Sequence, residues 1–597
     1  MSIKLGFDRE TQKPVYFPPK AFERHLHLIG YTGAGKTTAI ITLLVNMLTQ
    51  RSNSKCVIII DRLGGFSLDL LRWFSSPLLC PPWVQDRLLY IEPAREDVTI
   101  SLNPLVYQTP GEGYYRTARA AEIVLRGWDS QDLAKMPRLM KWLFNSMWAV
   151  AQMGLTLTDT QHLLFPKSRY HQQLLQRLPP LLMNEWGQIM SAGNQPKSNS
   201  NRPRNRMKPY FDSPVLKAMF ASPVNRLNVL EWMREKKVVV INLAPMGRLP
   251  DQSADTIGGL IVNEVFAVAR SLPPELRQDT LLVLDEFQRF IGPDLEFSLA
   301  ESSQLKTSLV LSHQSFSQLE RGDTDLTSLI FQAQSRLMLR VAGNDAKILS
   351  EELNEFSFDP MKIKDELYTR SQRVSGHKLV ELHSSSNSEQ LAEEWSRNFG
   401  TVLGDTRGRS GKYLEPLRDR TLSESQSQSV SRGESEGFKE SKWRTHGTSQ
   451  SYLPIYEEYS QLASRTYSSF EEQRAMWGQK LRRLMPGEGI LQIANDNNLL
   501  HLTVERTAPA HLGVEWGTVL KDMPMVADNY HKLMEKNFSQ GCFVTPQTAL
   551  QEAAVRLGEV LGESITVREL SEPSPGTEPE KPRPPTDPPP RKNPYEN

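Results

Sequence analysis

HLHLIGYTGAGKTT, residues 25–38, is the stretch of sequence that decides the fold. Its middle part, Gly30–Thr37, fits the spacing G-x4-G-K-S/T. The apolar run before it is typical of a short buried strand, and Thr37–Leu48 has the periodicity of a helix. A strand, a glycine-rich turn and a helix in this order are the context that a phosphate-binding loop requires. The alternative is a glycine turn before a helix with a purely structural role.

The residues of the predicted loop suit a bound nucleotide. Glycines let the backbone turn so that successive N–H groups point at one anion. The helix that follows directs the positive end of its dipole at the same phosphates. Lys36 places a charge on the β and γ phosphates, and the hydroxyl of Thr37 is a ligand for Mg²⁺. We expect the nucleotide to be bound by Gly30, Thr32, Gly33, Ala34, Gly35, Lys36, Thr37 and Thr38.

A second apolar strand, in LLVLDEF (281–287), delivers two carboxylates to its carboxyl end, where ligands bind in open α/β sheets. Asp285 is the predicted second ligand of Mg²⁺, through water, and Glu286 the residue that orients and deprotonates the attacking water. Gln314 ends the next strand, which places its amide beside the γ-phosphate. With Lys36, these form the predicted catalytic set. Without the loop, acidic and polar strand ends would be the ordinary interpretation.

Further apolar runs at Cys56–Asp61, Lys237–Leu243 and Arg336–Val341 alternate with helical patterns such as Ala254–Arg270. Buried strands separated by helices predict an α/β fold with a mostly parallel, doubly wound sheet. Asp61 closes one of these strands, either as a carboxylate that supports the metal site or as a turn former; both interpretations stay open.

Helical spacing without strand signals predicts an all-helical insertion at 112–235, between core halves at 1–111 and 236–383. Inside the insertion, Ser191–Pro209 carries five basic residues and no acidic one, and we predict a loop there. Its basic side chains either contact nucleic-acid phosphates or are simply solvated. They are Lys197, Arg202, Arg204, Arg206 and Lys208.

The remaining sequence predicts four segments: a Ser-rich flexible stretch, a helix with a β-hairpin, a helical extension and a disordered Pro-rich tail. Their ranges are 384–451, 452–508, 509–571 and 572–597. The helices are expected at Ser469–Leu484 and Pro546–Leu561. The hairpin is expected from two apolar runs that flank Asn495–Asn498.

The composition of the 597-residue chain excludes several classes of protein and indicates its location in the cell. The 70 Lys and Arg residues balance 69 Asp and Glu residues, which excludes a uniformly basic nucleic-acid coat. The three cysteines are far apart and form no CxxC pair, so a disulfide framework and a zinc site are not expected. No apolar run approaches the roughly 18 residues of a membrane span. We therefore expect a cytoplasmic protein without stable membrane insertion of its own.

The motifs resemble one known superfamily. The phosphate loop, CVIIID (56–61), SLNPL (101–105), LLVLDEF (281–287) and LVLSHQSFSQL (309–319) come in the order seen in the HerA/FtsK superfamily. They are most similar to the branch that contains the conjugative coupling proteins of type IV secretion (TraG/TraD-like) and HerA-like DNA translocases. The resemblance covers about residues 25–350.

The resemblance implies a RecA-like core in a ring, usually a hexamer, that moves DNA through its pore by ATP hydrolysis. ATP and Mg²⁺ are then the cofactors. Lys36 and Thr37 are implied as their ligands, Glu286 as the base and Gln314 as the sensor of the γ-phosphate.

The chain departs from the superfamily at two points. It begins close to the phosphate loop, without the membrane helices or β-barrel that relatives carry there. The family's arginine, which acts on the neighbouring subunit's nucleotide, falls here on Ser303. Such an arginine is worth about 10³–10⁵ in rate. The candidates to replace it are Arg336, Arg340, Arg289 and Arg321.

The predicted function is an ATP-dependent, ring-forming DNA translocase of the coupling type. One alternative is an ATP-binding recruitment platform for a secretion channel that hydrolyses little. Another is the motor subunit of a phage-defence complex. The expected partners are DNA, further copies in a homo-hexamer, and a secretion-channel, relaxosome or nuclease protein.

Overall fold

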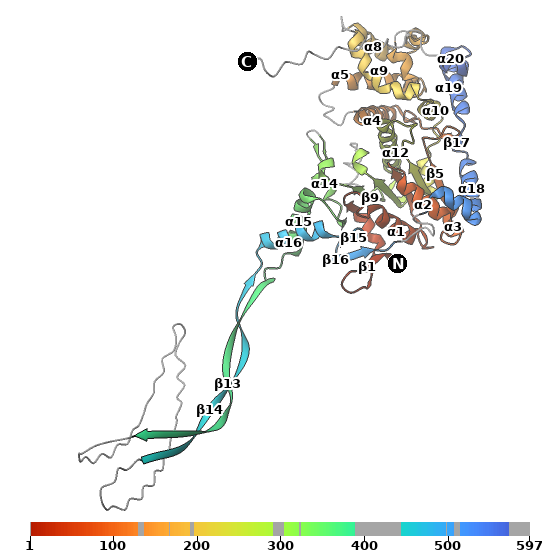
Figure 1. Cartoon of the computed structure of the whole chain (residues 1–597). Coiled ribbons are helices and arrows are strands. Elements are labelled where there is room, and N and C mark those ends of the chain that lie inside the picture. Colours follow the sequence, from red (N-terminus) through yellow and green to blue (C-terminus); the bar gives the residue numbers. More distant parts are fainter. Residues whose placement is uncertain are drawn as a thin grey trace, which may run out of the picture. The chain divides into compact units, whose positions relative to one another are not determined.

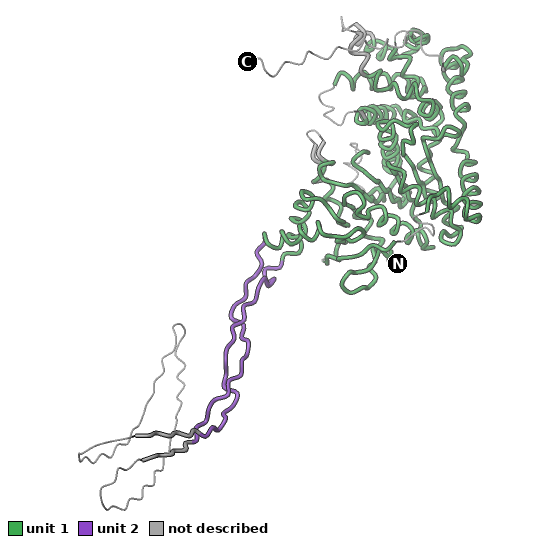
Figure 2. Tube along the Cα trace, in the orientation of Figure 1, with its two compact units in different colours: residues 1–358, 471–597 green, residues 359–470 purple. Residues whose placement is uncertain are grey.

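The computed structural model describes residues 2–128, 137–165, 168–191, 196–290, 304–321, 324–388, 443–496, 498–506 and 514–571. The chain divides into two compact units, which Figure 2 colours separately. The first comprises residues 1–358 and 471–597, and the second residues 359–470. The first unit contains a large sheet with its helices, and the second is a β-ribbon.

Eleven of the described strands form one sheet, in the order β2-β1-β16-β15-β12-β3-β9-β8-β4-β7-β5. The seven from β12 to β5 run parallel to one another. Their bounds, in sheet order, are Ser335–Met338, Leu26–Ile29, Thr307–His313, Thr280–Asp285, Cys56–Asp61, Val238–Asn242 and Leu88–Ile91. The predicted α/β fold with a mostly parallel sheet is therefore confirmed.

Helices cover both faces of the parallel strands. Alternate residues of β4 enter two different hydrophobic cores, with Ile58 and Ile60 in one and Val57 and Ile59 in the other. Such two-sided burial explains why the strand sequence is a continuous apolar run instead of an alternating one. Helices α1 and α2 contribute to the second core, and α4, α12 and α15 to the first. These helices span Lys36–Leu48, Gly65–Ser75, Pro110–Trp128, Asp251–Ser271 and Gly343–Ser357.

Four antiparallel strands extend the sheet beyond β12. The predicted hairpin is present as β15 (Glu488–Gln492) and β16 (Leu499–Val504). β15 pairs with β12, and β16 pairs with β1 (Ile3–Asp8), which in turn pairs with β2 (Pro14–Phe17). The C-terminal hairpin is thus inserted between the N-terminal strands and the parallel core.

The described elements between 110 and 234 are all helices, as the periodicity of this region predicts. Figure 1 shows α4, α5, α8, α9 and α10 grouped together in the first unit. The bounds of α5 to α11 are Pro137–Gln152, Thr160–Leu164, His171–Gln176, Pro180–Ser191, Pro196–Asp212, Pro214–Ala221 and Val229–Arg234.

The loop predicted over Ser191–Pro209 is wrong for most of that range, because Pro196–Asp212 forms α9. Residues 192–195 lie outside the described part of the chain. The helix carries an apolar stripe in which Met207, Tyr210 and Phe211 are buried. Residues spaced in this way share one helix face. Packing of this stripe outweighs the low helix propensity of the polar, proline-containing segment.

The second unit is an antiparallel ribbon of two long strands, β13 (Ile363–Ser388) and β14 (Trp443–Tyr467). Residues 363–383 belong to it, which corrects their predicted place in the core. The described ends of the predicted flexible stretch 384–451 are strand as well. Residues 389–442 lie outside the description. The described side chains of the ribbon are mostly exposed, so the strands need no apolar periodicity that a sequence pattern would reveal.

Both predicted C-terminal helices are confirmed, as α16 (Phe470–Arg483) and α19 (Pro546–Leu561). The predicted tail at 572–597 lies outside the described residues. The other helices here are α17, α18 and α20, at Trp516–Asp522, Pro524–Phe538 and Val567–Ser571. A short strand, β17 (Phe543–Val544), pairs with β6 (Thr99–Ile100).

The remaining elements are short. They are η1 (Pro19–Arg24), α3 (Pro82–Gln85), η3 (Pro274–Leu276), η4 (Phe287–Arg289), η5 (Phe316–Gln318), β10 (Glu320–Arg321), β11 (Thr324–Asp325) and α14 (Thr327–Ile330). None of the described helices has the length and apolarity needed to cross a bilayer.

Candidate functional site

The glycine-rich loop connects β3 to α1 in the way its sequence predicts. Gly33 and Gly35 have φ angles of 82° and 107°, in the region that side chains with a Cβ rarely adopt. Gly35 is also the N-cap of α1. A Cβ on Gly30 would lie 2.9 Å from Cβ of Leu339, so glycine is needed there for space. The loop therefore ends on the N-terminus of a 13-residue helix.

Lys36 opens that helix and turns back over the loop. Its Nζ donates a hydrogen bond of 2.6 Å to the carbonyl oxygen of Gly30. Only 8% of the residue is exposed. Burial lowers the pKa of the ammonium group, while the nearby carboxylates of Glu286 and Asp285 raise it. Thr37 and Thr38 follow in the first turn of α1, both partly exposed.

The two carboxylates lie at the carboxyl end of β8, which is separated from β3 by β9 alone. Oδ1 of Asp285 accepts a 2.7 Å hydrogen bond from Oγ of Ser312 on β9. Burial raises the pKa of Asp285 to about 6, the Ser312 hydrogen bond opposes this, and Asp61 and Glu286 raise it further. Glu286 is 5% exposed and has a φ of 55°, an unusual backbone conformation for a residue that is not glycine.

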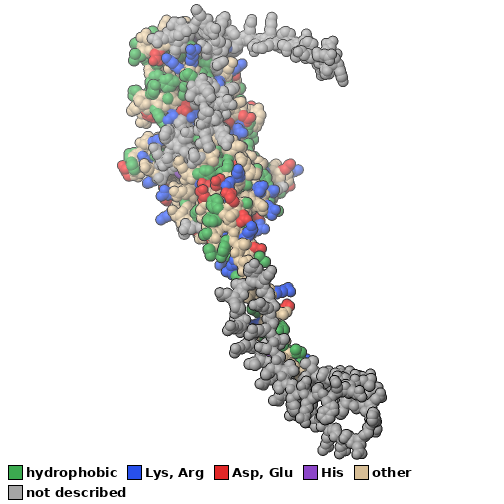
Figure 3. All heavy atoms as spheres, turned by 90° about the vertical axis from the view of Figure 1, so that its left-hand side faces the viewer, with side chains coloured by type: hydrophobic (Ala, Val, Ile, Leu, Met, Phe, Trp, Pro, Cys, Tyr) green, Lys and Arg blue, Asp and Glu red, His purple; other side chains and the backbone are tan. Residues whose placement is uncertain are grey.

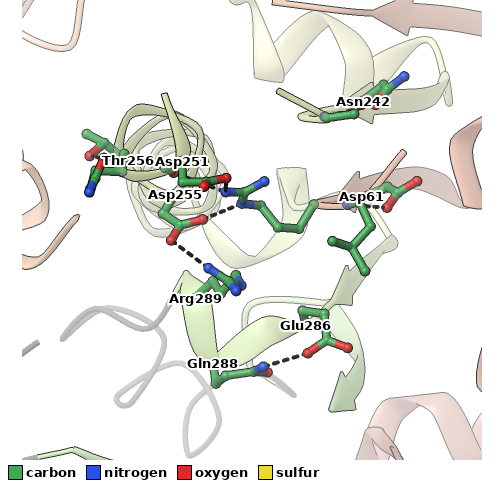
Figure 4. Close-up of polar contacts among 12 residues, drawn as sticks. Asp61, Asn242, Asp251, Asp255, Thr256, Glu286, Gln288 and Arg289 are labelled. Carbon is green, nitrogen blue, oxygen red and sulfur yellow. Dashed lines mark hydrogen bonds and ion pairs between the residues drawn. The ribbon is translucent and has the colours of Figure 1, made fainter. Parts of the chain in front are cut away.

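A chain of hydrogen bonds joins the loop to Glu286 through Gln314. Oγ1 of Thr32 donates to Oε1 of Gln314 at 2.9 Å, and Nε2 of Gln314 donates to Oε1 of Glu286 at 2.7 Å. The second carboxylate oxygen of Glu286 accepts a 2.6 Å hydrogen bond from Nε2 of Gln288, which Figure 4 shows. The structure thus brings the predicted residues together, and it adds Gln288, which no sequence motif marks.

Asp61 forms a turn. Its Oδ1 accepts from the backbone N–H groups of Leu63 and Gly64 at 3.0 and 2.9 Å, and its Oδ2 from that of Ser67 at 2.7 Å. These bonds satisfy donors at the start of α2. Of the two open interpretations of Asp61, the structure favours the turn former.

A charged cluster lies beside the Glu286 turn (Figure 4). The buried guanidinium of Arg62 pairs with Asp255 at 2.5 Å and with Asp251 at 2.6 Å. Asp255 also pairs with Arg289 at 3.3 Å. Hydrogen bonds from Arg62 to both aspartates raise the pKa of the guanidinium despite its burial. No sequence pattern marks Arg62, because a single arginine after a strand is not distinctive.

Two buried histidines connect the strands that carry the loop and Gln314. Nε2 of His27 on β3 lies 2.8 Å from Nε2 of His313 on β9. Nδ1 of His313 lies 3.1 Å from the carbonyl oxygen of Ser315, so this nitrogen carries the proton and His313 Nε2 accepts from His27. Burial lowers the pKa of both rings, that of His313 to about 4. The pair is therefore neutral and structural at neutral pH.

The turn that precedes the C-terminal hairpin contacts the phosphate loop. The backbone N–H of Gly487, in the turn before β15, donates to the carbonyl oxygen of Ala34 at 2.9 Å. A Cβ on Gly35 would lie 3.1 Å from the backbone N and Cα of Gly487. No local sequence pattern predicts this contact between the turn and the loop.

The candidate trans arginines differ in their surroundings. Arg336 is 5% exposed, and its guanidinium pairs with Glu352 at 2.6 Å. This burial makes Arg336 unsuited to reach a neighbouring subunit. The guanidinium of Arg340 lies 5.3 Å from the ring centroid of Tyr31 in the loop. Arg289 keeps 42% of its side chain exposed. Ser303 and the side chain of Arg321 lie outside the description.

Two of the basic residues on α9 have described partners within the insertion. The guanidinium of Arg204 lies 3.8 Å from the ring centroid of Phe165. Nζ of Lys208 lies 3.8 Å from a carboxylate oxygen of Asp212. The side chains of Lys197 and Arg202 lie outside the description. A DNA contact by this segment stays a prediction.

Comparison with known proteins agrees with this geometry. Residues 3–129 match the family model of the central domain of the helicase HerA. This part of the chain, which includes the glycine-rich loop, is thus similar to a HerA central domain. The match confirms the resemblance to the HerA/FtsK superfamily that the sequence motifs indicate. No curated protein sequence matches the chain.

Several solved structures show a looser likeness to this chain. The bacterial conjugative coupling protein TrwBΔN70 is 14% identical, over 85% of this chain and 89% of its own, with a TM-score of 0.45. The plasmid coupling protein TrwB in complex with ADP and Mg²⁺ is 13% identical, over 86% and 92%, with a TM-score of 0.44. VirB4 of Thermoanaerobacter pseudethanolicus is 15% identical, over 59% and 88%, with a TM-score of 0.36. Because all three TM-scores are below 0.5, these structures support no functional conclusion about this chain. Any such conclusion depends on the residues of the site.

Proposed function

We propose that the chain hydrolyses ATP with Mg²⁺ and uses the energy to move DNA, as a ring of identical subunits of the coupling type. The observation that carries the proposal is the hydrogen-bonded path from Thr32 through Gln314 to Glu286. This path connects the end that would bind the γ-phosphate to the carboxylate that would act on water. A glycine turn with a purely structural role before α1 would not require these hydrogen bonds.

The described residues fit a nucleotide and its metal. Left-handed Gly33 and Gly35 shape the backbone ahead of the N-terminus of α1, which favours an anion. Lys36 lies over the loop, within reach of phosphates bound there. The Thr37 hydroxyl and the Asp285 carboxylate are the hard oxygen ligands that Mg²⁺ prefers. Bound Mg²⁺ would supply charge stabilisation for the transferring phosphoryl group. The binding set remains Gly30 and Thr32 to Thr38.

In this proposal Glu286 orients the attacking water and accepts its proton while the bond from the γ-phosphorus to the leaving ADP oxygen breaks. Low exposure of Glu286 keeps bulk water from competing for its carboxylate. Gln314 holds the same carboxylate and the loop residue Thr32 at once. A change at the γ-phosphate therefore alters the hydrogen bonding of the base directly, which is the requirement for a sensor.

DNA as the substrate is supported by the match to a helicase domain and by the order of the motifs, not by overall charge. Figure 3 shows described basic and acidic side chains interspersed on the visible face, in keeping with a formal charge of +1. Any DNA-binding surface must then be local. The competing function is an ATP-binding recruitment platform, which the lack of an arginine at Ser303 favours.

ATP turnover with and without DNA tests the proposal, with the wild type compared with Glu286→Gln. We expect DNA to stimulate the wild type and the substitution to lower kcat by at least about 10²-fold, the lower end of the range for loss of a general base. The control is Glu355→Gln, an exposed residue of α15, which should leave turnover unchanged. If ATP turnover is absent in the wild type, or is equal in both proteins, the proposed translocase function is wrong. That result would favour the ATP-binding recruitment platform.

A further inference from the structure

The turn that follows Glu286 contains a second amide that touches the proposed base. Gln288 lies on η4 and is 3% exposed. Its Nε2 donates to Oε2 of Glu286 at 2.6 Å and to Oε1 of Gln318 at 3.2 Å. We propose that Gln288 is a positioning residue that holds one oxygen of the Glu286 carboxylate during hydrolysis, with Gln318 as its anchor. The inference rests on the proposed role of Glu286 as the base.

The chemistry of the neighbours fixes the orientation of the Gln288 amide. The carboxylate oxygen of Glu286 accepts only, and the nearby atom of Gln318 is its amide oxygen, so both need a donor from Gln288. This leaves Oε1 of Gln288 buried with no hydrogen-bond partner among the described residues. An unsatisfied buried oxygen lowers the stability of the fold. An apolar side chain that only filled the space would not leave an unsatisfied oxygen. We therefore assign the role of Gln288 to its Nε2 donor.

The two amides on Glu286 have different anchors. Gln314 holds Oε1 and also accepts from Thr32, so its hydrogen bonds change with the phosphate loop. Gln288 holds Oε2 and is tied to Gln318, which touches no loop residue in the described contacts. Gln314 can therefore release Oε1 while Gln288 keeps Oε2 in place. Oε1 becomes the oxygen that faces the attacking water, with the carboxylate plane already set.

Gln318 also ties the two amides into one unit. Its Oε1 accepts the backbone N–H of Gln314 at 3.2 Å as well as the amide of Gln288. The sensor's backbone and the positioning amide thus share one acceptor on η5. This keeps the distance between Gln314 and Gln288 constant when the Gln314 side chain changes partners.

The backbone of Glu286 is held separately. The N–H of Arg289 donates to the carbonyl oxygen of Glu286 at 3.0 Å, and the Arg289 side chain pairs with Asp255, as Figure 4 shows. A residue other than glycine at positive φ is strained, and the contacts of this turn must offset that strain. The turn fixes the position of the Glu286 backbone, and Gln288 fixes the position of its carboxylate.

The first test is Gln288→Met in the full chain, which keeps the volume and removes the donor. Loss of a hydrogen bond to a charged group is worth about 1.5–3 kcal/mol, so kcat for ATP hydrolysis should fall about 10–100-fold. The KM and the dissociation constant of a fluorescent ATP analogue should stay within about twofold, because Gln288 touches no loop residue. The control is Gln547→Met on the exposed face of α19. An unchanged kcat, or a rise in KM that accounts for the whole effect, would overturn the inference.

The second test separates positioning from general damage. In Glu286→Asp the carboxylate is one methylene shorter and no longer reaches Gln288, so adding Gln288→Met should cause no further loss of kcat. A full further loss in the double variant would show that Gln288 acts independently of Glu286 and contradict the inference. Normal turnover by Glu286→Gln would instead remove the proposed function. If Gln288→Met does not fold, Gln318→Met on the half-exposed η5 replaces it with the same expected direction. That substitution removes the anchor of Gln288 together with the acceptor for the Gln314 backbone N–H.

Discussion

The substitution Gly35→Ala tests how firmly the C-terminal hairpin is joined to the phosphate loop. Gly35 has a φ of 107°, and a Cβ there would lie 3.1 Å from the backbone N and Cα of Gly487. Gly33 offers a matched control, because its φ is also positive, at 82°, but a Cβ there meets no atom within 4 Å. Gly33→Ala therefore reports backbone strain alone, while Gly35→Ala adds the clash with the hairpin.

The expected magnitudes follow from these two environments. A side chain at positive φ costs about 1–2 kcal/mol. Overpacking against backbone that cannot rotate away costs a further 1–3 kcal/mol or so. We therefore expect Gly35→Ala to lower the free energy of unfolding by about 1–3 kcal/mol more than Gly33→Ala. Relief of the clash should also displace Gly487 and break its hydrogen bond to Ala34.

Urea unfolding of the two variants and the wild type measures the difference in free energy. Hydrogen exchange supplies the local measurement, since the Gly487 amide should exchange faster in Gly35→Ala than in Gly33→Ala. Equal destabilisation of the two variants, with equal protection at Gly487, would refute the idea that the hairpin turn packs on the loop. The refutation would extend to the sheet order, in which β15 and β16 lie between β1 and β12.

Two further expectations concern the site. Lys36→Ala should abolish binding of a fluorescent ATP analogue, and retained tight binding would count against the site. Stability should also fall between about pH 6.5 and pH 4 through His313, whose native pKa of about 4 means that the unfolded state binds the proton first. The slope is at most about 1.4 kcal/mol per pH unit for one group. In His313→Gln the dependence should flatten, while Asp285, whose raised pKa acts in the opposite direction, is common to both proteins. Parallel pH profiles of the two proteins would contradict the assignment.

Local sequence predicts those parts of the molecule in which local chemistry decides the conformation. The loop needs glycine at Gly33 and Gly35 because of their φ angles, so the spacing alone reveals it. The central strands are buried on both faces and therefore read as continuous β-branched runs. Asp285 and Glu286 were found because such a run ends on them. The structure confirms the mostly parallel sheet for the same reason.

The parts that were missed depend on contacts between distant segments. α9 forms because Met207 and Tyr210 find a core, although its composition resembles a loop. The hairpin was visible as a turn between apolar runs, but its partners β1 and β12 lie far away in the sequence. No local pattern distinguishes Gln288 from the other glutamines of the sequence; its importance follows from its contact with Glu286 in the fold. A pattern within one segment contains no information about such pairings.

The two halves of the phosphate loop are held in different ways, and this difference explains how the loop could report on a nucleotide. Thr32 is exposed, and the space around Gly33 is open. Ala34, by contrast, is fully buried and bonded to Gly487. The half that contacts Gln314 can therefore adapt to the phosphates, while the half that begins α1 stays fixed against the sheet. A movement at Thr32 is then passed to Gln314 and Glu286 instead of being absorbed by a shift of the whole loop.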